Sequence, residues 1–124
     1  MRKIFRVLPA VFLVSSLGCH AHQISPPDPE RLSREEMLEA HFTNVYDAVA
    51  SLRSAWLTVR GTDSFAQTSQ VVVYFDSTRL GGVGELGGVM VNQVASIRHY
   101  NGVDATMRFG VGHSAGVILL SSYR

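Results

Sequence analysis

The sequence contains few of the residues that would cross-link the chain or attract nucleic acid. Cys19 is the only cysteine among 124 residues, so no disulfide can form within one chain. The only lysine, Lys3, lies near the start. If residues 1–18 are removed, eight of the eleven basic residues remain against ten acidic ones, a net charge of −2 with neutral histidines. No basic patch remains, and we expect no contact with nucleic acid.

The sequence also lacks an apolar run long enough to cross a bilayer, which needs about 20 residues. The run from Val7 to Val14 is shorter and is interrupted at Pro9 and Ala10. A basic head precedes it, and small residues follow it at 15–18. This layout predicts a signal peptide over residues 1–18.

Cys19 directly follows this segment and resembles the lipidated cysteine of bacterial lipoproteins. That family usually has leucine three residues earlier, where this chain has Ser16. The resemblance implies acyl chains on Cys19, and His20 in place of aspartate implies sorting to the outer membrane. The alternative is ordinary cleavage after Gly18 or Ala21, which would release a secreted domain.

Cys19, His20 and His22 are of the types that bind zinc. They lie within four residues, and no second cluster is present to complete a tetrahedral site. We therefore expect no metal site and no other cofactor.

Proline is concentrated in one place, with three of the four prolines at residues 25–29. Prolines lack the backbone donor that regular structure needs and favour an extended chain. We expect a tether over residues 19–30 and a domain over 31–124.

The domain is predicted to begin with two short helices, over about 33–40 and 44–53. Ser33 and Glu36 have the spacing of a capping box, and Asn44 is a second candidate N-cap. An apolar stripe at steps of 3 and 4 runs through both segments from Leu38 to Trp56, so one long helix is the alternative.

Four strands are expected after the helices. Alternation predicts strands over 56–61 and 96–100, and apolar runs predict strands over 71–75 and 117–120. A short helix is expected near 91–94, a turn at Asn101 and Gly102, and another turn near 105–109. Arg98 and Tyr100 should share one face of their strand, with His99 on the other, and we assign His99 no role. The fold class is α+β, with two N-terminal helices packed on a small mixed sheet of about four strands.

Residues 112–116 read GHSAG and fit the G-x-S-x-G pattern of serine hydrolases. No Asp, Glu or His follows Ser114, and an apolar run typical of a strand comes next, where that motif requires a helix. Triads with His41 or His99 and Asp47 or Asp104 are not required by any spacing. The favoured interpretation is a glycine turn into the last strand, with no enzymatic activity, and a small secreted serine hydrolase is the alternative.

Residues 82–87 fit G-x-G-x-x-G, a dinucleotide-binding pattern. Six residues separate Gly82 from the preceding predicted strand, and the glycines at 87 and 88 would break the helix that the pattern requires. We expect an exposed loop over 77–88, with Asp76, Arg79 and Glu85 as candidate contact residues.

From residue 31 onward, six segments resemble in order the plug domain of TonB-dependent outer-membrane receptors: 32–37, 43–49, 73–76, 91–97, 104–110 and 116–122. Ser77 departs from the glycine that follows the aspartate in that family. The resemblance implies a plug-like module, and no barrel strands follow it in this sequence.

The expected function is therefore that of a membrane-anchored envelope lipoprotein that does no chemistry. Its partners would be the membrane, through the anchor, and an outer-membrane receptor or another envelope protein. The expected location is the outer membrane, facing the periplasm.

Overall fold

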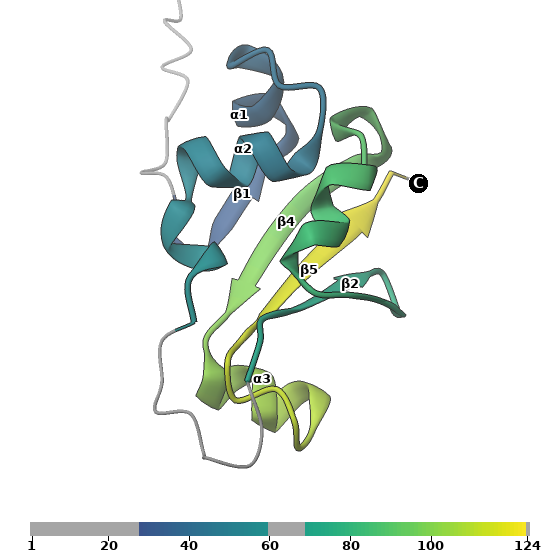
Figure 1. Ribbon diagram of the computed structural model, residues 1–124. Coiled ribbons are helices and arrows are strands. Elements are labelled where there is room, and N and C mark those ends of the chain that lie inside the picture. Colours follow the sequence, from purple (N-terminus) through teal and green to yellow (C-terminus); the bar gives the residue numbers. More distant parts are fainter. Residues whose placement is uncertain (1–27, 60–68, 124) are drawn as a thin grey trace, which may run out of the picture.

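The computed structural model describes residues 28–59 and 69–123. These residues form an α+β domain with one mixed sheet in the order β1-β4-β5-β2-β3 (Figure 1). The strands are β1 (Arg31–Ser33), β2 (Val72–Phe75), β3 (Thr78–Gly81), β4 (Val94–Tyr100) and β5 (Val117–Ser122). The expected fold class is confirmed, with five strands in place of about four.

The last strand, β5, lies in the centre of the sheet. It pairs antiparallel with β4 and parallel with β2, so that Val117 and Ile118 lie opposite Val72 and Val73. These four side chains are buried. β-Branched side chains suit a strand buried on both faces, which explains why the two apolar runs form interior strands.

The two strands that were not predicted are the edges of the sheet. β1 has three residues and pairs with β4, and β3 has four residues and pairs with β2. β3 follows a turn at Asp76 and Ser77, so the expected loop over 77–88 is in part a strand. Edge strands this short carry too few residues to display an alternating pattern.

Two separate helices, α1 (Arg34–Glu39) and α2 (Val45–Leu52), begin at the predicted caps. Ser33 and Glu36 form the capping box, and the side chain of Asn44 accepts a hydrogen bond from the amide of Asp47 at 2.8 Å. Between the helices His41 has a φ of 59°, in the left-handed region, which a continuing helix does not allow. The chain therefore forms two short helices and not one long one.

The strand predicted from Trp56 is wrong. Ser54–Leu57 forms a 3-10 helix, η1, and Trp56 is buried in the main core. The apolar residues at helical spacing thus continue to Trp56. For this segment the helical spacing predicts the structure better than the short alternation that follows it. Residues 60 and 61 of the predicted strand lie outside the described residues. Two further 3-10 helices are η2 (Val83–Gly88) and η3 (Val91–Gln93), the second close to where a short helix was expected.

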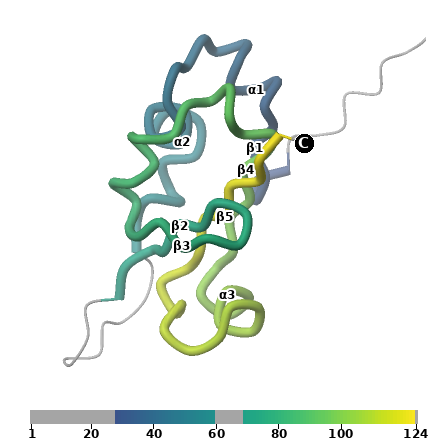
Figure 2. The backbone as a smooth tube through the Cα atoms, turned by 90° about the vertical axis from the view of Figure 1, so that its right-hand side faces the viewer, coloured from purple at the N-terminus to yellow at the C-terminus, as the bar shows by residue number. Residues whose placement is uncertain are grey.

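The turns predicted after β4 are also wrong, because Gly102–Phe109 forms the helix α3. The side chain of Asn101 accepts hydrogen bonds from the amides of Val103 and Asp104, both at 3.0 Å. Asn101 is thus an N-cap, a role that asparagine fills as readily as a turn position. Figure 2 shows α3 at one end of the domain, away from α1.

The sheet has a different apolar cluster on each face. The main core includes Val73, Ile97 and Leu120 and packs under α1, α2 and the 3-10 helices. On the other face a smaller cluster of Val72, Ala105 and Val117 packs with three aromatic rings, those of Tyr74, Tyr100 and Phe109. The helical layer on one face and α3 at the end can be followed in Figure 2.

Candidate functional site

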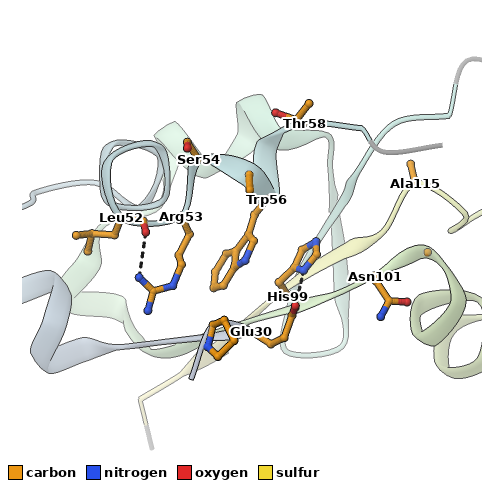
Figure 3. Close-up of a pocket in the computed structure, with 12 residues that line it drawn as sticks. Glu30, Leu52, Arg53, Ser54, Trp56, Thr58, His99, Asn101 and Ala115 are labelled. Carbon is orange, nitrogen blue, oxygen red and sulfur yellow. Dashed lines mark hydrogen bonds and ion pairs between the residues drawn. The ribbon is translucent and has the colours of Figure 1, made fainter. Parts of the chain in front are cut away.

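A cavity of about 460 Å³ lies between the end of α2, η1 and the end of β4 (Figure 3). This volume is in the range of small-molecule sites. Its walls combine an aromatic ring, charged groups and hydroxyl and amide groups. The lining residues are Pro29, Glu30, Leu52, Arg53, Ser54, Ala55, Trp56, Thr58, His99, Asn101, Gly102 and Ala115.

His99 is held in this cavity from two sides. Its Nδ1 lies 2.7 Å from Oε2 of Glu30, and its ring stacks on Trp56 at 5.4 Å between centroids, with 9° between the planes. The backbone amide of His99 also donates to the carbonyl oxygen of Glu30 at 2.9 Å. The alternation of β4 places His99 and Tyr100 on opposite faces, as predicted, but no role was predicted for His99. Its stacking partner Trp56 was predicted on a strand, so the pair could not be identified.

Arg53 closes the same cavity at the end of α2. Its guanidinium lies 3.2 Å from Oε1 of Glu36 and donates to the carbonyl oxygens of Leu52 and Arg31, at 3.0 and 3.4 Å. Arg53 thereby links α1, α2 and β1. Because its neighbours hold it in place, it is a fixed wall of the cavity.

The polar groups of the cavity can bind a ligand by hydrogen bonds, but they do not form an arrangement for nucleophilic catalysis. Glu30 offers a carboxylate, Asn101 an amide, and Ser54 and Thr58 offer hydroxyls. Within residues 28–59 and 69–123, no serine hydroxyl is hydrogen-bonded to a histidine, the contact that such catalysis uses.

The GHSAG segment forms a turn into β5. Gly112 and Gly116 have φ values of 96° and 105°, in the region that favours glycine. Ser114 is exposed, and its Oγ lies 3.4 Å from Oγ of Ser69. A strand follows where the hydrolase motif requires a helix, in agreement with the glycine-turn interpretation.

His113, for which no role was predicted, is the buried polar residue of this turn. Its Nδ1 donates to the carbonyl oxygen of Gly110 at 3.0 Å, because a carbonyl only accepts. In the neutral ring, Nε2 then accepts a hydrogen bond from the Tyr74 hydroxyl at 2.9 Å. Both nitrogens are used to hold the turn against β2.

The three predicted contact residues lie on three different elements. Asp76 is in the turn after β2, where its Oδ1 accepts a hydrogen bond from the amide of Ser122 at 2.9 Å. Arg79 lies on β3 and Glu85 on η2, and both are exposed. Asp76 therefore has a structural role in the sheet, and Arg79 and Glu85 stay candidates for surface contacts.

The glycine pattern over 82–87 lacks the surroundings of a dinucleotide site. β3 lies between β2 and Gly82, and a short 3-10 helix follows in place of an α-helix. Such a site places the pyrophosphate at the start of an α-helix that directly follows a strand. The interpretation without a dinucleotide is the better one.

Three findings bear on metals, membranes and known relatives. In the part of the chain that the structure describes, no three His, Cys, Asp or Glu residues are grouped to hold a metal ion. No helix of the described residues is long and apolar enough to cross a membrane. Cys19, His20 and His22 lie outside those residues. No family model, curated protein or solved structure matches the chain.

Proposed function

We propose that the chain is an envelope lipoprotein of a bacterium, held by acyl chains on Cys19 at the outer membrane, with its domain facing the periplasm. The domain is a plug-like binding module that does no chemistry. Its partner is an outer-membrane receptor or another envelope protein. The signal-like segment before Cys19 supports the anchor.

The observation that carries the binding role is the cavity beside Trp56 and His99. Its walls are fixed before any ligand arrives, because the Glu30 contact and the ring stacking hold the imidazole. A preformed wall loses little side-chain entropy on binding. An inserted side chain of a partner would find both an aromatic surface and hydrogen-bonding groups there.

The anchor is tested by changing Cys19 to serine in the full chain. The wild-type protein should sediment with membranes, and Cys19→Ser should move it to the soluble fraction, because the acyl chains supply the membrane affinity. The same fractionation with Ser16→Leu, which keeps the cysteine, is the matched control and should leave the protein in the membranes. An unchanged distribution of the Cys19→Ser protein contradicts lipidation.

The binding role is tested by filling the cavity. Ala55 is exposed and lines it, so Ala55→Arg should block access without removing a buried side chain. Affinity capture from envelope extracts should recover a partner with the wild-type chain and lose it with Ala55→Arg. The control is Arg79→Ala with Glu85→Ala, which changes the β3 and η2 surface.

The two sets of variants separate the two surfaces. If only the Arg79 and Glu85 changes release the partner, the contact lies at the β3 edge and the role assigned to the cavity is wrong. If the wild-type chain retains no partner, the binding role itself is contradicted.

A further inference from the structure

The end of the domain formed by α3 exposes large apolar side chains. Val103 and Met107 are 71% and 82% exposed, and Val111 in the following turn is 97% exposed. These are the three highest values among the large apolar residues that the structure describes. Val103 and Met107 are four residues apart, so they lie on one side of α3. Val103 and Met107 also line one hollow together, and exposed apolar side chains that lie together mark a contact surface.

Two arginines stand beside this apolar surface. The guanidinium carbons of Arg98 and Arg108 lie 5.6 and 5.2 Å from the centre of the Tyr100 ring. Both arginines and Met107 line one hollow of about 430 Å³. Within the described ranges neither arginine has an ion pair.

The carboxylates of the same hollow are already engaged. Oδ2 of Asp104 accepts a hydrogen bond from the side chain of Asn101 at 2.8 Å, and Glu30 is paired with His99. The two guanidiniums form no ion pair with either carboxylate, so they stay available to anionic groups of a partner. Arginines next to exposed apolar side chains complement a phospholipid surface, with its phosphates above its acyl chains.

The proposed anchor joins the domain at the same hollow. Glu30 lines it together with Met107 and Arg108. The chain from Cys19 to Glu30 can span about 36 Å at most, at roughly 3.3 Å per residue. If Cys19 carries the lipid anchor proposed above, this length of chain keeps the hollow within that distance of the bilayer.

We propose that the α3 end of the domain is a membrane-contact surface that rests on the phospholipid bilayer to which Cys19 is anchored. Val103, Met107 and Val111 lie in the interfacial region, and Arg98 and Arg108 lie at the lipid phosphates. Individually weak contacts are sufficient, because a short tether gives the surface a high effective concentration at the membrane. The opposite end of the domain, with α1, then faces the periplasm.

Site-specific tryptophan quenching tests this orientation in the full, lipidated chain. Met107→Trp places a reporter on α3, and the matched control Met90→Trp places one at another exposed methionine, just before η3. Each variant is reconstituted into phosphatidylethanolamine and phosphatidylglycerol vesicles with brominated acyl chains. The fluorescence that the new tryptophan adds to that of Trp56 is compared with and without bromine on the acyl chains. It should fall by about twofold for Met107→Trp and should not change for Met90→Trp, because only the first reporter reaches the acyl region.

Other results overturn the proposal in distinguishable ways. Equal quenching at both positions, or none at position 107 while the protein stays on the vesicles, contradicts the membrane-contact surface and leaves the anchor intact. A wild-type chain that leaves the vesicles as readily as Cys19→Ser shows that the anchor failed, and the orientation fails with it.

The arginines have a separate test in the Met107→Trp background. Arg98→Gln with Arg108→Gln should reduce the quenching, and Arg79→Gln on β3 should not. Replacing phosphatidylglycerol with phosphatidylcholine should also reduce it, because the anionic headgroup attracts the guanidiniums. If neither the double arginine substitution nor the change of lipid reduces the quenching, the role of the arginines is contradicted.

Discussion

Two neighbouring side chains of the GHSAG turn have opposite environments. His113 is 8% exposed and hydrogen-bonded at both ring nitrogens, whereas Ser114 is exposed. We expect His113→Ala to lower the free energy of unfolding by about 2 kcal/mol, because it leaves the Tyr74 hydroxyl and the Gly110 carbonyl without this partner. Urea unfolding followed by circular dichroism measures the change.

Ser114→Ala is the matched control and should change the free energy of unfolding by less than about 0.5 kcal/mol. It also tests the hydrolase alternative, since a nucleophilic serine is indispensable for acyl transfer. Ester hydrolysis by the wild-type chain that disappears in Ser114→Ala would overturn the proposal that the protein is not an enzyme. Equal destabilisation by both substitutions would contradict the structural role of His113.

Asp76 combines a left-handed backbone with a hydrogen bond between strands. Its φ is 52°, and its Oδ1 accepts from the amide of Ser122. We expect Asp76→Ala to lower the free energy of unfolding by about 1 kcal/mol, because alanine removes the acceptor and tolerates this backbone less well. Asp76→Asn keeps an acceptor oxygen, and asparagine tolerates the left-handed backbone, so this change should lower the free energy of unfolding by less. Thermal unfolding of the two variants, compared with the wild-type chain, checks the order.

At the level of elements, β5 begins where the chain passes close to the end of β4. A Cβ on Gly116 would lie 2.9 Å from the carbonyl oxygen of Tyr100, in addition to the strain of a φ of 105°. Gly112 has a similar φ, 96°, but a Cβ on Gly112 would have no other atom within 4 Å. Gly112→Ala should therefore cost about 1 kcal/mol of stability through the backbone alone, and Gly116→Ala should cost more.

Denaturant midpoints of these two variants measure that difference. Gly87→Ala, in η2, is a control with no nearby atom and no positive φ. A loss at Gly116 no larger than at Gly112 would mean that the approach of β5 to β4 is not tightly packed.

The elements that were predicted correctly carry strong local signals. The caps at Ser33 and Asn44 mark α1 and α2, and the apolar runs after residues 70 and 116 mark β2 and β5. Each signal lies within the segment itself. A cap side chain binds the free backbone amides of its own helix, and a strand that is buried on both faces has to be apolar.

The elements that were missed depend on their neighbours. β1 is defined by its pairing with β4. β3 pairs with β2 after a turn at Asp76 and Ser77, which has no glycine to mark it in the sequence. Asn101 and Gly102 are compatible with both a turn and a helix start, and tertiary packing of α3 decides between them. The sequence of these segments does not contain the deciding interaction.

On the scale of the whole molecule, the candidate site is assembled from distant segments. Glu30, Trp56 and His99 meet although up to 69 residues separate them. No motif spacing reveals such a contact, because it depends on where η1 lies over β4. By contrast, Arg79 and Glu85 could be named from sequence, because exposed polar residues near glycines are recognisable locally.

The two faces of the sheet should differ in how they unfold. The small cluster under α3 depends on Phe109, whose ring stacks on Tyr74 at 5.0 Å and meets Tyr100 edge to face at 5.5 Å. Phe109→Ala removes both contacts but touches none of the main core, so we expect α3 to open locally. Hydrogen exchange should then accelerate at the amides of α3 by about tenfold or more, and those at the centre of β5 should stay protected.

Met107→Ala is the control for this experiment, because Met107 is on the same helix but exposed, and alanine is a good helix former. It should leave the exchange of α3 amides unchanged. If Phe109→Ala instead accelerates exchange equally in α3 and β5, the two faces of the sheet unfold as one cooperative unit. In that case the aromatic cluster stabilises the whole domain and not α3 alone.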